Sequence, residues 1–234
     1  MQDLKSIHPR LELKISPRAR RLALRLDSKR QIVNLVVPKR ASLRKAYDFA
    51  RQHTSWIEEK ITALPPPIIL TDGLVVSVLG RDRTIRIVRP DGLKRTTITM
   101  RDDAILIETN KDDPSPRLIR FLKEQIKEKL TELSCEKAAK IGKTIKSVSV
   151  RDTRSRWGSC AKDGNLSYSW RLAFAPTEAI DYLAAHEVAH LEHMNHGSKF
   201  WALCEELSAD YKAGKTWMAE HGHNLMRYSA AASI

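Results

Sequence analysis

Two histidines, His186 and His190, stand four positions apart and enclose Glu187, which directly follows the first of them. Side chains four residues apart on a helix lie one turn above one another on the same face, so both imidazoles could bind one tetrahedral ion. A carboxylate beside the first ligand could then reach a water on that ion. The pattern is typical of hydrolysis, because a cation lowers the pKa of its water and the carboxylate takes up the proton.

A third histidine, His196, follows in the segment Asn195-His196-Gly197, which predicts the turn that ends this helix. A chain that turns back there can bring His196 to the same ion and leave the fourth position for water. The spacing matches that of extended zincin motifs, although His193 occupies the position of their turn glycine. We therefore predict one Zn²⁺ per chain, with Glu187 as the catalytic base. The predicted ligands are His186, His190 and His196.

Other donors near the motif offer alternative ligand sets. His193 shares nearly the same helical face as the first two histidines, but three ligands on one helix would be poorly spaced around a tetrahedron. Glu205 or Glu206 would supply a carboxylate from the following helix, as gluzincins do. Three nitrogen donors with an open position suit zinc best, although manganese, cobalt or nickel can occupy such sites.

The segment from Arg154 to Cys160 combines cations, a glycine and a tryptophan. A strand beside an active-site helix can pair with an extended substrate, and Gly158 would permit close approach of the backbone. Arg154 and Arg156 are therefore candidate substrate-binding residues, since a guanidinium can hold a carboxylate or a phosphate. The alternative interpretation assigns Trp157 and Cys160 to the core and Gly158 to a bulge, and we favour it for the tryptophan and the cysteine.

The chain of 234 residues carries a formal net charge of +13. A basic surface attracts polyanions, so nucleic acid or a nucleotide is a candidate partner, whereas the alternative is a solvated face that maintains solubility. The sequence contains no zinc finger, helix-turn-helix or aromatic RNA-binding signature. The basic residues of the first third include Arg18, Arg20, Arg21, Arg25, Lys29, Arg30, Lys39, Arg40, Arg44 and Lys45.

Several features predict a cytoplasmic protein without a membrane segment. No apolar run reaches the roughly 18 residues of a membrane span, and the first residues lack the apolar core of a secretory signal. Three widely separated cysteines without a CxxC pair suit a reducing compartment and offer no cysteine zinc site. They are Cys135, Cys160 and Cys204.

The hydrophobic periodicity predicts an α+β fold in two parts. Residues 1–112 are expected to form a basic, β-rich domain with one helix over 42–63, and the polar segment at 110–116 marks its end. Residues 113–234 are expected to form a zincin-like metallohydrolase domain. It would contain a long helix that ends near Gly142, strands at about 145–151 and 165–172, the motif helix from about 175 to 194, and a helix from Ser198.

The quoted motifs resemble those of the YgjP-like family of metal-dependent hydrolases. The resemblance is carried by Arg156-Trp157-Gly158-Ser159-Cys160, by Asp181 to Leu191 around the histidine motif, and by Asn195 to Trp201. Members of the YgjP-like family are similar in their catalytic region to the SprT and WLM metalloproteases. The resemblance implies a compact zincin unit from about residue 114 onward with the ligands and base named above. It covers the second half of the chain well and leaves the substrate open.

We therefore predict a zinc-dependent metallohydrolase, most simply a metallopeptidase that acts on a peptide or protein substrate. The first alternative keeps the metal and hydrolyses a nucleoside triphosphate or another phosphate ester, because a basic cleft would suit such a substrate. The second alternative is a nucleic-acid-associated module with a structural metal. An open coordination position argues against the second alternative, since structural zinc usually has four protein ligands.

Overall fold

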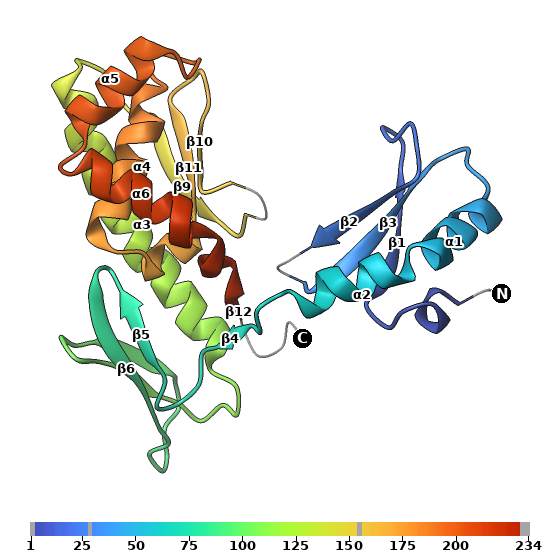
Figure 1. Cartoon of the computed structure of the whole chain (residues 1–234). Coiled ribbons are helices and arrows are strands. Elements are labelled where there is room, and N and C mark those ends of the chain that lie inside the picture. Colours follow the sequence, from blue (N-terminus) through green and yellow to red (C-terminus); the bar gives the residue numbers. More distant parts are fainter. Residues whose placement is uncertain (1–2, 28–29, 154–155, 230–234) are drawn as a thin grey trace. The chain divides into compact units, whose positions relative to one another are not determined.

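The computed structural model describes residues 3–27, 30–153 and 156–229, which form two compact units that divide between Ile68 and Ile69 (Figure 1). The first unit contains a sheet with the order β1-β3-β2, in which β1 is parallel and β2 antiparallel to β3. One face of the sheet packs on two helices, and Leu11, Leu35 and Ile57 lie in their common core. The elements are η1 (Leu4–Ser6), β1 (Leu11–Ser16), β2 (Ala23–Asp27), β3 (Ile32–Pro38), α1 (Leu43–Gln52), α2 (Thr54–Thr62) and, at the junction, β4 (Ile68–Ile69).

The single helix predicted over residues 42–63 is instead two helices, α1 and α2, which are interrupted at His53. His53 leaves the helical conformation with φ −113° and ψ 20°. Its ring Nδ1 donates a hydrogen bond of 2.8 Å to the carbonyl oxygen of Phe49. Such a side-chain bond competes with the helical ladder for a backbone carbonyl, and periodicity alone does not reveal it.

Basic residues of the first unit gather at one end of its sheet. Because β1 and β3 run parallel, the segments that follow them leave the sheet at the same end. Within the described part of the chain, no carboxylate forms an ion pair with the cations of these segments, so this end of the unit is strongly positive. The cations are Arg18, Arg20, Arg21, Lys39, Arg40, Arg44 and Lys45.

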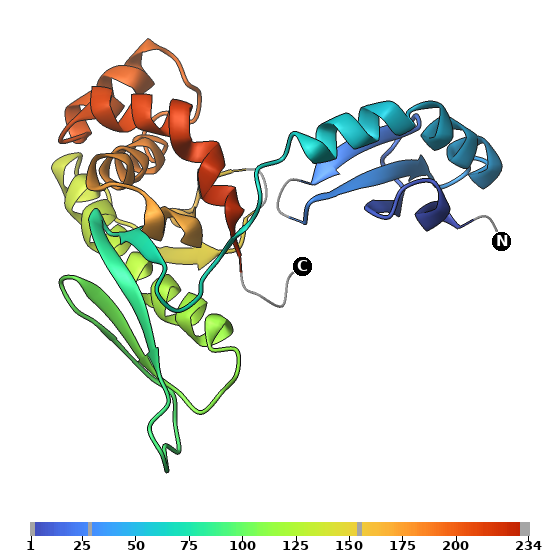
Figure 2. The same ribbon diagram turned by 60° about the horizontal axis from the view of Figure 1, so that its bottom comes forward.

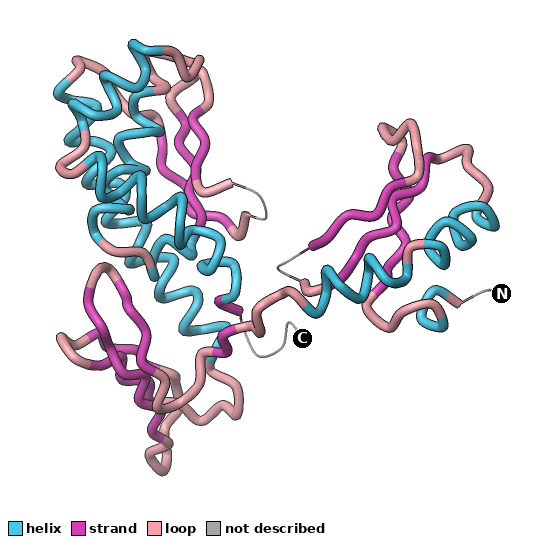
Figure 3. The backbone as a smooth tube through the Cα atoms, in the orientation of Figure 1, coloured by secondary structure: helices cyan, strands magenta, loops and turns pink. Residues whose placement is uncertain are grey.

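The second unit contains a four-stranded sheet, a three-stranded sheet and helices α3 to α6 (Figures 2 and 3). One sheet has the order β5-β6-β8-β7 and the other the order β10-β11-β9. The first-sheet strands are β5 (Val75–Val78), β6 (Arg81–Val88), β7 (Thr97–Met100) and β8 (Ala104–Glu108). The remaining elements are α3 (Ser115–Lys140), β9 (Ser147–Arg151), β10 (Gly158–Cys160), β11 (Asn165–Ser169), η2 (Trp170–Phe174), α4 (Thr177–Ala189), α5 (Ser198–Leu207), α6 (Tyr211–His221), η3 (Gly222–Arg227) and β12 (Tyr228–Ser229).

The domain boundary expected between residues 112 and 113 falls inside this second unit. Inward residues of the first sheet, such as Val78, Ile85 and Ile105, belong to the same core as Leu118 and Leu122 of α3. The polar segment before α3 is therefore a connection within one unit. Its composition is that of a linker because a surface loop between a strand and a helix needs the same polar, proline-containing residues.

Helix α4 is buried on nearly all sides, since ten of its thirteen residues are buried. Small residues on α4 and a glycine on α6 allow this close packing. A Cβ at Gly214 of α6 would lie 2.4 Å from the carbonyl oxygen of Glu178 and 2.5 Å from Cβ of Tyr182.

No helix among the described residues is long and apolar enough to cross a membrane.

A buried ion pair joins three helices of the second unit. Lys137 Nζ of α3 lies 2.5 Å from Oδ1 of Asp181 on α4, with only 4% and 13% of the two side chains exposed. The same ammonium donates to the carbonyl oxygen of Leu207 at the end of α5 (2.7 Å). The second carboxylate oxygen of Asp181 accepts from the backbone N–H of Ala209 (2.7 Å). The charges are therefore both paired and hydrogen-bonded, as burial requires.

Replacing Lys137 with methionine should lower the free energy of unfolding of the second unit by about 3 kcal/mol, because Asp181 would stay buried without its counter-charge. Urea unfolding would be followed by fluorescence in a Trp56→Phe background, in which every remaining tryptophan lies in the second unit. The matched variant Lys140→Met removes an exposed pair with Glu136 and should cost less than about 0.5 kcal/mol. Equal losses would contradict the role of the buried pair.

Candidate functional site

The motif histidines lie where helix α4 ends. His186 is in the last turn of α4, and His190 is the residue that caps it, so the helix stops earlier than the predicted end near residue 194. The backbone N–H of His193 still bonds to the carbonyl of Ala189 (2.9 Å), which continues the turn. Helix α5 begins at Ser198, two residues after His196. The chain therefore turns back across the end of α4, as the sequence predicts.

His186, His190 and His196 come together in space. One ligand nitrogen from each lies within 4.8 Å of the other two, and no further group of this kind occurs among the described residues. Two nitrogens that bind one tetrahedral ion at about 2 Å lie roughly 3.3 Å apart. Nε2 of His186 and Nε2 of His196 are 3.2 Å apart. This spacing fits two ligands of one metal ion.

The tautomer of His190 is fixed by its surroundings. Nδ1 of His190 lies 3.0 Å from the backbone carbonyl oxygen of His193. Because a carbonyl only accepts, Nδ1 carries the proton and the lone pair remains on Nε2. His193 thus supports a candidate ligand through its backbone and is not part of the cluster itself. The alternatives Glu205 and Glu206 are also outside the cluster.

Burial favours the neutral form of two candidate ligands, His186 and His190. Burial, together with the neighbouring rings of His190 and His196, lowers the pKa of His186 to about 4. Burial likewise lowers the pKa of His190, which the bond to the His193 carbonyl opposes. Neutral imidazole is the form that binds metals, so the lowered pKa values of His186 and His190 suit a divalent cation.

Two aromatic residues of α5 pack around the histidines. The ring of Phe200, which is fully buried, lies 4.9, 4.6 and 4.6 Å from the rings of His186, His190 and His196. Trp201 lies 5.5 Å from the ring of His196. These contacts hold the turn that carries the third histidine.

Glu187 lies beside the cluster and is only 3% exposed. Burial raises the pKa of its carboxyl to about 8, while the charge of Arg156 acts in the opposite direction. Its Oε2 is buried and has no hydrogen-bond partner among the described residues. A buried carboxylate oxygen without a partner is costly, which is a common feature of reactive groups.

Gly158 on strand β10 makes the position of Glu187 possible. A Cβ on Gly158 would lie 2.2 Å from Oε1 and 2.6 Å from Cδ of Glu187. The close backbone approach inferred for this glycine is therefore found, and the group that approaches is the candidate base. Any side chain at this position would displace the carboxylate.

A cleft of about 450 Å³ opens on the site. Arg156 lines it together with His186 and Glu187, whereas Arg154 lies outside the described residues. Helix α6 also contributes to the lining, which no motif in the sequence indicates. The α6 residues are Lys215, Met218 and Ala219.

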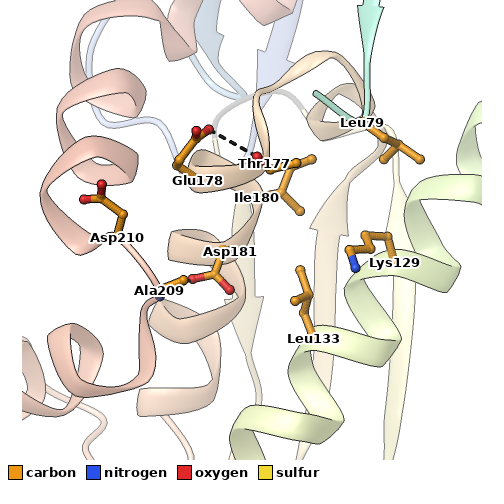
Figure 4. A pocket seen from close by; sticks show the side chains of 9 residues that line it. All are labelled: Leu79, Lys129, Leu133, Thr177, Glu178, Ile180, Asp181, Ala209 and Asp210. Atoms are coloured by element: carbon orange, nitrogen blue, oxygen red, sulfur yellow. Dashed lines mark hydrogen bonds between the residues drawn. The ribbon is translucent and has the colours of Figure 1, made fainter. Parts of the chain in front are cut away.

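A separate cavity of about 280 Å³ lies at the opposite end of α4 (Figure 4). Figure 4 shows apolar side chains from α3 and α4, Leu133 and Ile180, in its lining. Asp181 also lines it, but its carboxylate is already bonded to Lys137 and Ala209. The lining includes no histidine or cysteine, so this cavity lacks the donors that the cleft offers.

Comparison with known families agrees with this geometry. Residues 20–221 match the family model described as "YgjP-like, metallopeptidase domain". The chain belongs to the YgjP-like family. No curated protein and no solved structure gives a significant match. The resemblance noted in the sequence is thus confirmed, and the YgjP-like domain is a metal-dependent hydrolase whose three clustered histidines are suited to hold the metal that the family implies.

Replacing His196 with alanine should weaken metal binding by more than about 100-fold. Losing a metal ligand should lower the affinity more than losing a residue that only hydrogen-bonds to a ligand. The dissociation constant would be measured by competition with a chelator. His193→Ala is the matched control, because the bond to His190 comes from the backbone carbonyl of His193, which the substitution retains. Equal affinity in the His196 variant and the wild type would exclude His196 as a ligand.

Replacing Gly158 with alanine should displace Glu187 and lower hydrolytic turnover about 100-fold, while the metal content stays unchanged. Ser159→Ala is the control, since Ser159 lines a different groove on the same strand. Full turnover in the Gly158 variant would show that the carboxylate position is not critical.

Proposed function

We propose that the chain is a zinc-dependent metallopeptidase in which His186, His190 and His196 hold the ion. The convergence of the three nitrogens within 4.8 Å carries this proposal. Three protein ligands leave one position open, as in catalytic zinc sites, whereas structural zinc sites have four. Imidazole donors also suit zinc well. When bound, the ion lowers the pKa of a coordinated water and polarises a carbonyl oxygen.

Glu187 is the proposed general base. Glu187 directly follows the first ligand, His186, in the sequence. The raised pKa of its carboxyl allows it to hold a proton and to deliver that proton to the leaving amine. Its Oε2 has no partner among the described residues and can therefore accept a proton from the attacking water. Contact with Gly158 limits the movement of the carboxylate, which supports a fixed position during the reaction.

The free edge of β10 supports a peptide substrate. Trp157 and Ala161 form backbone bonds with Ser169 and Asn165 on the β11 side (2.8 and 2.9 Å). Because bonded and non-bonded positions alternate in an antiparallel pair, the backbone groups of Gly158 and Cys160 face away from β11. Among the described strands, only β11 pairs with β10. An extended peptide can add to such an edge through its main chain, beside Glu187.

Glu187→Gln should abolish turnover while zinc remains bound, because the amide cannot take up a proton. Metal content and cleavage of unfolded proteins would be measured for the wild type and the variant, with nucleoside triphosphates as a second substrate panel. Glu192→Gln is the control, since Glu192 is an exposed residue paired with Lys143.

Each outcome has a distinct meaning. Zinc near one per chain with peptide cleavage by the wild type alone would support the proposal. Turnover of nucleotides without cleavage of peptides would keep the metallohydrolase and reject the peptidase. A zinc-bound wild type that turns over neither panel would favour a structural metal.

A further inference from the structure

Lys215 of helix α6 brings a positive charge to the candidate active site. It lines the same cleft as His186 and Glu187, although it lies 28 residues beyond the base in the sequence. Arg156, which precedes β10, lines this cleft as well. Two cations from different elements therefore border the cleft that contains the candidate base.

The ammonium of Lys215 is held in a defined position. Nζ donates a hydrogen bond of 2.7 Å to the hydroxyl of Tyr211 and lies 4.5 Å from the ring centroid of Trp201. The Trp201 ring in turn lies 5.5 Å from that of His196. A cation over an aromatic face is attracted by the ring, so these contacts orient the charge beside the metal site.

The charge of this cleft is not balanced by carboxylates. Within the described part of the chain, no carboxylate forms an ion pair with Lys215 or Arg156. Glu187 is the one acidic side chain in the lining, and it is reserved for the base in the proposed mechanism. Paired cations that border a cleft raise the local concentration of anions and bind carboxylate or phosphate oxygens.

We propose that Lys215 and Arg156 form an anion-binding subsite that holds a carboxylate of the substrate close to the scissile bond. In a peptide this carboxylate is an acidic side chain or the terminal carboxylate, while a phosphate offers the same chemistry in a nucleotide. The inference rests on the proposed peptidase for the choice of carboxylate. The subsite selects among substrates and adds no step to the reaction.

Binding tests this subsite without turnover. Zinc-loaded Glu187→Gln protein would be titrated by calorimetry with peptides that differ only by Asp against Asn, or by a free against an amidated C-terminus. We expect one of these charged peptides to bind about tenfold more tightly than its neutral partner, as one partly exposed ion pair allows. Lys215→Met should remove most of this preference, and Lys215→Glu should reverse it toward peptides with Lys.

Lys212→Met and Lys212→Glu provide matched controls, because Lys212 is exposed on the same helix and does not line the cleft. Zinc content is measured for every variant, so that a merely structural loss is recognised. Where the peptides bind, a charge preference that is absent, or that persists in both Lys215 variants, overturns the subsite.

A nucleotide arm separates the two proposals. If ATP binds with the same dependence on Lys215 and no peptide binds or is cleaved, the anion subsite stands and the peptidase is rejected. If peptides are cleaved with no preference for acidic groups, the peptidase stands and the subsite is rejected.

Discussion

The buried carboxylate of Glu187 is the constraint to which the rest of the second unit is fitted. A carboxylate without a partner is unfavourable in an apolar interior, and burial raises its pKa to about 8. It is kept there by the shape of its surroundings, since the backbone at Gly158 leaves no room for a Cβ beside it. This arrangement works only if α4 and β10 keep their separation. The apolar burial of α4 and the close approach of α6 at Gly214 provide the necessary rigidity.

Buried cations brace this helix away from the chemistry. Lys137 ties α3 to Asp181 on α4 and to the end of α5, so three helices share one charge. Before α4, the buried Arg171 pairs with Asp152 after β9 (2.5 Å) and donates to the carbonyl of Tyr228 (3.1 Å). Removing either partner of the Lys137–Asp181 pair, or removing Asp152, would leave an uncompensated charge in the interior. Both pairs thus brace the N-terminal half of α4 and the segment before it, whereas no carboxylate of the described residues forms an ion pair with the cations of the cleft.

The clustering of the three histidines was predicted from neighbouring residues, whereas features that depend on packing or on a single side-chain bond were not. The histidine motif follows from helical spacing, and His196 follows from the turn beside it, because both depend on a few neighbouring residues. The domain boundary near residue 112 was misplaced, since a polar loop has the same composition within a unit as between units. The break at His53 depends on one side-chain bond to Phe49. Lys215 had no signal at all, because its role depends on how α6 packs against α4.

The charges of the cleft connect metal binding with the selection of substrate. Neutral imidazoles bring no negative charge to the site, so a bound divalent cation would keep its full charge there. One carboxylate, Glu187, then faces that ion and two further cations, Arg156 and Lys215. A cleft with this excess favours a substrate that carries an anionic group, and that group need not touch the metal. The main chain of β10 can align a peptide of any sequence, whereas α6 contributes the charge that would distinguish one peptide from another.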